Sequence, residues 1–210
     1  MMTKAIILDL GGVLVDIDLR NCIRHFQDVL GYHKITEILD ASHQKGIYSE
    51  LEEGILSPDD FRKKVLAESK PGATAKELDE CMWSLLTRMD GYKAAFLNEL
   101  SKKYDLYILS NNNPISMERC HEVFTQSGLD YRKVFRKEFI SYQMKLLKPS
   151  KAIYEEVVRQ IGLPPEELVF VDDSLSNVQA AESVGIPSLH YKQGSDLVSQ
   201  LNAKLEARGC

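Results

Sequence analysis

Acidic and small polar side chains follow three separate apolar runs in this sequence of 210 residues. In chain order, the pairs are residues 5–8 with Asp9, residues 106–109 with Ser110 and Asn111, and residues 168–171 with Asp172 and Asp173. An Asp carboxylate can attack phosphorus as a nucleophile. Two adjacent acids after a buried strand repel each other unless a cation is present, and Mg²⁺ prefers carboxylate, water and substrate oxygens. The three groups therefore predict metal-assisted phosphoryl transfer.

The apolar runs before these groups show no polar alternation, which is typical of central parallel strands covered on both faces. Helical patterns follow at residues 115–126 and 176–184, and a further strand is expected at 188–191. Strands that alternate with helices predict an α/β fold around a parallel sheet. Since ligands bind beyond the carboxyl ends of such strands, we expect Asp9, Ser110 and Asp172 to converge on one crevice.

A long stretch between the first two strands, residues 18–90, contains no strand-like run. It shows amphipathic helical patterns at 19–30, 35–45, 58–70 and 75–89, the third with Ser57 as its N-cap. We interpret the stretch as a small inserted α-helical cap and assign residues 1–17 and 91–210 to the core. A cap above the crevice would exclude water and select the substrate. The alternative is a set of helices packed flat on the sheet.

Lys148 precedes Pro149 and offers a positive point charge that can neutralise phosphate and carboxylates. Lys145 is close enough in sequence to compete for this role, and a surface position is the default for either lysine. Ser110 and Asn111 suit the binding of phosphate oxygens, although the same residue types also favour an ordinary turn.

Composition narrows the function classes. The net charge of −5 argues against an overall attraction to nucleic acid or an anionic membrane. The four cysteines are far apart, so they predict neither a metal site nor a disulfide framework. No apolar stretch reaches the roughly 20 residues of a membrane span, and acids break the N-terminal run, so we expect a cytoplasmic protein.

The stretch 131–137 interleaves aromatic and basic residues, a pattern that can stack on the bases of a nucleic acid. The alternative is a short segment in which Val134 and Phe135 face the core and the Arg and Lys side chains lie in solvent.

Four motifs in order resemble the haloacid dehalogenase-like hydrolase superfamily, and the resemblance covers nearly the whole chain. The motifs are LDLGGVLVD at 8–16, LSN at 109–111, KP at 148–149 and FVDDS at 170–174. Within the superfamily, the start of the chain is similar to bacterial α-D-glucose-1-phosphate phosphatases. The stretch 148–186 is similar to the branch that includes the N-terminal phosphatase domain of soluble epoxide hydrolase.

The resemblance implies a Rossmann-like core with a helical cap and an Mg²⁺-dependent phosphatase that acts on a small phosphorylated metabolite, with a sugar phosphate favoured. It implies an aspartyl-phosphate intermediate on Asp9. The implied magnesium ligands are Asp9, the Gly11 carbonyl and Asp173, with Asp172 assisting. The residues implied to bind phosphate are Ser110, Asn111 and Lys148, of which Ser110 and Lys148 also assist catalysis.

Gly11 departs from the family pattern, in which most phosphatases carry a second Asp two residues after the nucleophile as general acid and base. Glycine cannot transfer protons, although its carbonyl can still bind a metal. The candidates for the missing proton donor are Asp16, His25, His43 and water. A sugar hemiacetal leaving group would need less protonation than a plain alkoxide because its pKa is lower.

Three other readings compete with the phosphatase. A dehalogenase also lacks the second Asp, but it needs no metal, so the pair Asp172 and Asp173 argues against it. A phosphonate-cleaving enzyme would need a Schiff-base lysine in the cap, for which Lys34 and Lys45 are available. A catalytically silent or very slow protein that binds a phosphorylated ligand would explain Gly11, but it would have little need of a nucleophile.

Overall fold

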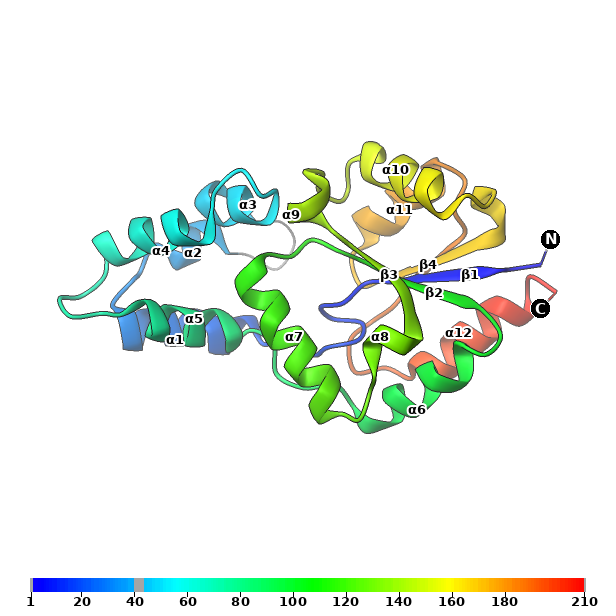
Figure 1. Cartoon of the computed structure of the whole chain (residues 1–210), viewed down its shortest axis with the longest axis horizontal. Coiled ribbons are helices and arrows are strands. Elements are labelled where there is room, and N and C mark those ends of the chain that lie inside the picture. Colours follow the sequence, from blue (N-terminus) through cyan, green and yellow to red (C-terminus); the bar gives the residue numbers. More distant parts are fainter. Residues whose placement is uncertain (1, 40–43, 210) are drawn as a thin grey trace.

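A parallel five-stranded sheet forms the centre of the protein in the computed structural model, which describes residues 2–39 and 44–209 (Figure 1). The strand order is β3-β2-β1-β4-β5. The strands are β1 (Ala5–Leu8), β2 (Asp105–Ser110), β3 (Phe135–Ile140), β4 (Leu168–Asp172) and β5 (Ser188–His190). Because β1 pairs in parallel with both β2 and β4, the residues that follow these three strands are neighbours. The predicted α/β fold with a Rossmann-like core is confirmed.

Helices cover both faces of the sheet (Figure 1). On one face lie α6 (Gly91–Leu100), α7 (Pro114–Gln126) and α12 (Leu197–Glu206), and on the other lie α10 (Lys151–Ile161) and α11 (Leu175–Ser183). Ile6 belongs to the hydrophobic cluster of the first face and Ile7 to that of the second, both fully buried. Successive side chains of a strand point to opposite faces, and here helices cover both faces. Every side chain of a central strand is therefore buried, which explains the unbroken apolar runs. Short turns α8 (Tyr131–Val134), α9 (Ser141–Met144) and η1 (Pro165–Glu167) complete the core.

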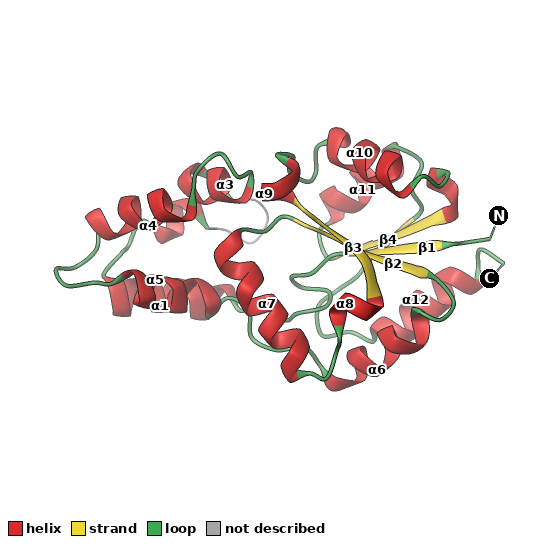
Figure 2. Cartoon of the chain, viewed as in Figure 1, coloured by secondary structure: helices red, strands yellow, loops and turns green. Residues whose placement is uncertain are grey.

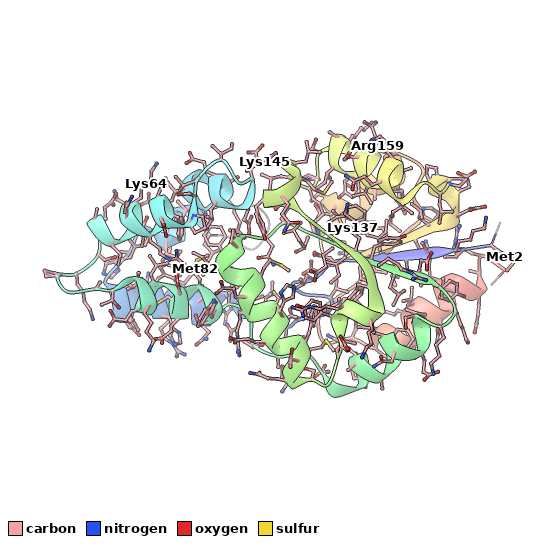
Figure 3. The ribbon with its side chains drawn as sticks, viewed as in Figure 1. Met2, Lys64, Met82, Lys137, Lys145 and Arg159 are labelled. Atoms are coloured by element: carbon pink, nitrogen blue, oxygen red, sulfur yellow. The ribbon has the colours of Figure 1, made fainter. Side chains whose placement is uncertain are left out.

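A second group of helices extends from one end of the core, and within the described residues it contains helices and loops but no strand of the sheet (Figure 2). Its members are α1 (Leu19–Leu30), α2 (Ile35–Ile38), α3 (Gly46–Glu52), α4 (Pro58–Ala67) and α5 (Ala75–Trp83). These helices have a hydrophobic cluster of their own, which includes Phe26, Tyr48, Phe61 and Met82. Met82 lies inside this helical part (Figure 3). Ile115 of α7 joins the cluster and connects it to the core.

The two chain segments that lead into and out of this helical part run side by side. The Asp16 N–H donates to the Arg88 carbonyl at 2.7 Å, and the Asp18 N–H donates to the Leu85 carbonyl at 2.9 Å. Ile17 and Leu86 form an antiparallel bridge between them. We propose that the segment 18–90 is an inserted cap domain, since it has its own hydrophobic cluster and this paired connection.

Several predicted elements have different bounds in the structure. The helix predicted at 35–45 is wrong: α2 ends at Ile38, Leu39 is extended at φ −119°, and the chain is extended again at Lys45. Residues 40–43 lie outside the described part of the chain. The helix predicted at 75–89 ends at Trp83, because the chain beyond it pairs with the segment that leads into the cap.

The structure adds β3, α3 and α6, which the sequence analysis did not predict. β3 is an edge strand in which Arg136 and Lys137 are exposed, while Phe135 and Phe139 are buried. The basic residues of this stretch contact acids of the same chain: Arg136 pairs with Asp105 at 2.8 Å, and Lys133 pairs with Asp130 at 2.7 Å. The core-facing interpretation of Val134 and Phe135 is confirmed, since both side chains are buried.

Among the described residues, no helix combines the length and the apolar character that a crossing of the bilayer requires.

Replacing Phe61 tests whether the cap has a core of its own. Phe61 is fully buried and meets the Tyr48 ring edge to face, with ring centroids 6.1 Å apart. We expect Phe61→Ala to lower the free energy of unfolding by about 3–5 kcal/mol, because it removes a buried aromatic side chain and leaves a cavity. Urea denaturation measures this change. Ile55→Ala, at a side chain that is 69% exposed, is the matched control and should shift it by less than about 0.5 kcal/mol. Equal effects of the two changes would contradict a packed cap core.

Candidate active site

A cavity of 440 Å³ lies where the carboxyl ends of the central strands meet the cap. Asp9 follows β1 directly, Ser110 is the last residue of β2, and Asp172 is the last residue of β4. The core residues on the cavity wall include Asp9, Gly11, Ser110, Asn111, Lys148 and Asp173, and the residues of α3 there are Tyr48, Ser49 and Glu52. The structure thus brings the predicted core residues together, with the exception of Asp172, which lies behind the wall.

Lys148 is the electrostatic centre of this group. Its ammonium lies 2.9 Å from Asp9 Oδ1 and 2.7 Å from Asp172 Oδ2, and it donates to the Leu109 carbonyl at 3.2 Å. Burial lowers the pKa of Lys148, but the carboxylates of Asp172 and Asp9 outweigh this effect and hold the pKa above its ordinary value. Lys148 is therefore a permanent positive charge between two acids.

Asn111 holds the backbone of Lys148 in place. The Asn111 side-chain amide donates to the Lys148 carbonyl at 2.9 Å, and the Lys148 N–H donates to Asn111 Oδ1 at 2.8 Å. Both polar atoms of the Asn111 side chain are thus engaged with the peptide units on either side of Lys148. The second hydrogen of the Asn111 amide nitrogen is not used in these two bonds and can be donated to a phosphate oxygen.

Within the described part of the chain, the contacts of the Asp9 carboxylate fall on one of its two oxygens. Oδ1 accepts the Leu10 N–H at 2.7 Å and lies next to the Lys148 ammonium. Oδ2 is the oxygen left to form new bonds in the cavity. Burial raises the pKa of Asp9 to about 7, with Lys148 opposing the rise and Asp172 and Asp173 adding to it. The environment of Asp9 therefore disfavours an isolated negative charge and favours the approach of a cation.

Three carboxylates form a candidate metal site. One oxygen each from Asp9, Asp172 and Asp173 lie within 4.8 Å of one another. Asp172 is oriented by the Asn177 amide at 3.0 Å and by the Ser174 N–H at 2.8 Å. The pKa of Asp173 is raised, mainly by burial and to a lesser extent by the negative charge of the neighbouring Asp172. An all-oxygen donor set of this kind fits a hard cation such as Mg²⁺.

Gly12 allows Asp173 to reach this cluster. The backbone of Gly12 has φ +77°, and a Cβ built there would lie 2.1 Å from Asp173 Oδ2. Any side chain at this position would displace the carboxylate, so the second glycine of the turn is required by geometry.

The other polar candidates from the sequence lie elsewhere. The Lys145 ammonium donates to the Gly54 carbonyl, at the junction of α9 and the cap where Figure 3 labels Lys145. Asp16 pairs with Lys93 at 3.5 Å, and His25 Nδ1 lies 2.8 Å from the Asn21 carbonyl within α1. None of these residues lines the cavity. His43 lies outside the described residues.

The cap lysines also lie away from the cavity wall in the described part of the chain. Lys34 pairs with Glu68 at 2.6 Å with both side chains about half exposed, and Lys45 precedes α3 without lining the cavity. A Schiff-base enzyme needs an amine beside the substrate. The positions of Lys34 and Lys45 therefore do not support the hypothesis of a phosphonate-cleaving enzyme.

Glu52 is the acidic residue of the site that the sequence analysis missed. It is 8% exposed and lies on the cavity wall. A signal was present in the sequence, because Glu52 follows Tyr48 by four residues and so shares the buried face of α3. An acid within the apolar stripe of a helix is unusual enough to mark a candidate site.

Comparison with curated proteins gives relatives of nearly the same length. A D-ribitol-5-phosphate phosphatase of Bacteroides thetaiotaomicron is 33% identical over 207 residues, which cover 98% of this chain and 100% of the relative. A sesquiterpene phosphatase of Aspergillus oryzae is 27% identical, with 89% of each chain covered.

Solved structures give the same family. A HAD family enzyme of Bacteroides thetaiotaomicron, crystallised as a mutant in complex with magnesium and inorganic phosphate, matches with a TM-score of 0.89 and 31% identity. The match covers 95% of this chain and 98% of that one. The model of the haloacid dehalogenase-like hydrolases matches residues 3–185, and on this match the chain belongs to the haloacid dehalogenase-like hydrolase family.

Proposed function

We propose that this protein is a magnesium-dependent phosphatase that hydrolyses the phosphate ester of a small metabolite through an aspartyl phosphate on Asp9. One observation carries the proposal: the Asp9 carboxylate borders a cavity, with one oxygen fixed by Leu10 and Lys148. A carboxylate held in this way is a nucleophile aligned for attack on a phosphorus atom in the cavity.

The charge of the site supports a divalent cation. Three carboxylates against the single ammonium of Lys148 leave an excess of two negative charges. This excess would repel a phosphate group. Asp9, Asp173 and the Gly11 carbonyl, with Asp172 assisting, would hold Mg²⁺, which supplies positive charge for the phosphoryl oxygens in the transition state. The magnesium in the crystal structure of the related Bacteroides enzyme supports this cofactor.

The chain's own residues perform the remaining tasks. Asp9 Oδ2 attacks phosphorus to form the acyl phosphate, and water then attacks the phosphoryl group and releases Asp9 as a carboxylate. Lys148 stays next to Asp9 Oδ1 and balances the charge that develops on the transferred group. Ser110 lines the cavity beside Asp9 and offers its hydroxyl to a phosphoryl oxygen. Asn111 keeps Lys148 in position through its two backbone contacts.

The lining of the cavity favours a hydroxylated substrate. On the cap side, the wall includes the polar side chains of Tyr48, Ser49 and Glu52, which can bind hydroxyl groups. An entirely apolar leaving group would offer no partner to the buried Glu52 carboxyl or to the partly buried Ser49 hydroxyl, at a cost in affinity. We therefore favour a sugar phosphate or sugar-alcohol phosphate, the class that includes the named substrate of the D-ribitol-5-phosphate phosphatase.

Phosphate release tests the proposal directly. With Mg²⁺, the wild-type protein should release phosphate from sugar phosphates, sugar-alcohol phosphates and p-nitrophenyl phosphate, and EDTA should abolish the release. Asp9→Asn should fall below about one thousandth of the wild-type rate, because it removes the nucleophile.

The matched control is Asp28→Asn, since Asp28 is an exposed acid on α1. This variant should retain wild-type activity. A wild-type protein that binds phosphate with Mg²⁺ but releases none from any substrate would instead support the silent binder that Gly11 allows.

Removal of the Lys148 charge should affect both stability and catalysis. In Lys148→Ala, Asp9 and Asp172 lose their buried partner, so without Mg²⁺ we expect the free energy of unfolding to fall by about 3–5 kcal/mol. The ratio kcat/KM should fall at least about a hundredfold, because the transferred phosphoryl group loses a stabilising charge.

Denaturation without metal and steady-state kinetics with Mg²⁺ measure the two effects. Lys151→Ala, at an exposed lysine of α10, should change neither quantity. Unchanged kinetics in Lys148→Ala would remove Lys148 from the catalytic group.

A further inference from the structure

A phosphatase of this design needs a group that gives a proton to the departing alcohol and takes one from water. Position 11 is glycine, and among the proton donors named from the sequence, those in the described residues lie off the cavity wall. The structure therefore has to supply the acid from another element, or leave the step to solvent.

Glu52 is the one carboxyl that the described part of the cap places on this wall. Its neighbours on the buried face of α3 are Tyr48 and Leu51, so the helix directs Glu52 inward with them. No hydrogen bond or ion pair to the Glu52 carboxyl is found among the described residues, whereas the carboxylates of Asp9 and Asp172 are each held by partners. The acid that faces Asp9 from the cap is thus left for a ligand.

The backbone around Glu52 is attached to the core. The Ser141 hydroxyl donates to the Glu52 carbonyl at 2.6 Å and accepts the Asn112 N–H at 3.0 Å. Two residues later, the Gly54 carbonyl accepts the Lys145 ammonium. These contacts fix the end of α3 against the loop that follows β2, so Glu52 is positioned relative to Asp9 rather than by the cap alone.

Burial keeps Glu52 suited to proton exchange. It raises the pKa of Glu52 to about 8, an effect that Lys148 opposes and Asp9 reinforces. An acid whose pKa lies near neutral pH can both donate and accept a proton during turnover.

We propose that Glu52 is the general acid and base of the reaction and takes the role that glycine at position 11 leaves vacant. This proposal rests on the proposed phosphatase function. It makes Glu52 a catalytic residue, because its carboxyl would touch the oxygen of the leaving group.

The protons and bonds balance as follows. In the first step, a bond forms between Asp9 Oδ2 and phosphorus while the bond from phosphorus to the substrate oxygen breaks. The Glu52 proton passes to that oxygen, and the product leaves as a neutral alcohol. In the second step, Glu52 takes a proton from water as the water oxygen attacks phosphorus. The bond to Asp9 breaks, inorganic phosphate leaves, and both carboxyls return to their starting forms.

The leaving group distinguishes proton transfer from a structural or binding role. An alkyl phosphate such as D-ribitol 5-phosphate must be protonated as it departs, whereas p-nitrophenolate departs without a proton. The ratio kcat/KM covers only the steps up to formation of the aspartyl phosphate, so the later hydrolysis of that intermediate, which is common to both substrates, does not affect it. We expect Glu52→Gln to lower kcat/KM at least about a hundredfold for the alkyl phosphate and less than about tenfold for p-nitrophenyl phosphate. Glu53→Gln, at the adjacent acid that does not line the cavity, is the matched control and should match the wild type for both substrates.

A second variant asks whether an acid at position 11 can replace Glu52. Among the described residues, a Cβ on Gly11 would meet Ile17 Cγ2 at 3.3 Å, so Ile17 has to move by a few tenths of an ångström. With the alkyl phosphate, the double variant Gly11→Asp with Glu52→Gln should therefore react at least about tenfold faster than Glu52→Gln alone. If Glu52→Gln folds poorly, Glu52→Asp keeps the acid and should retain the wild-type ratio of the two rates.

Other results would overturn the proposal. Equal losses of kcat/KM with both leaving groups, or a change in KM alone, would make Glu52 a structural or substrate-binding residue. Failure of Gly11→Asp to restore any activity would likewise contradict the replacement. A wild-type protein that releases no phosphate from either substrate would refute the phosphatase function itself, and the role of Glu52 with it.

Discussion

The buried ammonium of Lys148 between Asp9 and Asp172 is the interaction on which the rest of the structure depends. Taking three acids out of water at the end of a sheet is unfavourable unless positive charge accompanies them. Lys148 supplies one such charge, and the excess that remains selects a divalent cation. The strand order brings these groups together, because β1 lies between β2, which ends in Ser110, and β4, which ends in Asp172.

The cap forms the side of the cavity that the ends of the strands do not cover. The core contributes the proposed nucleophile, the proposed metal ligands and Lys148, while α3 contributes Tyr48, Ser49 and Glu52 to the cavity wall. Contacts from Ser141 and Lys145 attach the end of α3 to the core, so the cap side of the cavity has a defined position. Because the two sides of the cavity come from different parts of the chain, substitutions in the cap can change the substrate class while the residues of the core, and their chemistry, stay the same.

The sequence predicted the fold and the convergence of the core residues on one cavity, because both rest on local patterns. Unbroken apolar runs that end in acids identify central strands and their functional ends. β3 was missed because an edge strand with exposed Arg136 and Lys137 lacks that pattern. Glu52 was missed because α3 itself was not predicted; its spacing from Tyr48 marks it as buried, but its place on the cavity wall depends on where α3 packs against the core. The helix predicted at 35–45 failed because the amphipathic pattern does not show where the helix ends, and the backbone is already extended at Leu39.

The central claim is a covalent phosphoryl group on Asp9. Its most direct test is to quench the enzyme with acid during turnover of an alkyl phosphate, reduce any acyl phosphate with borohydride, and locate the modified residue by peptide mass spectrometry. The account predicts modification at Asp9 with Mg²⁺ and none with EDTA or in Asp9→Asn. Steady turnover with an unmodified Asp9, or with the modification on another residue, would contradict it.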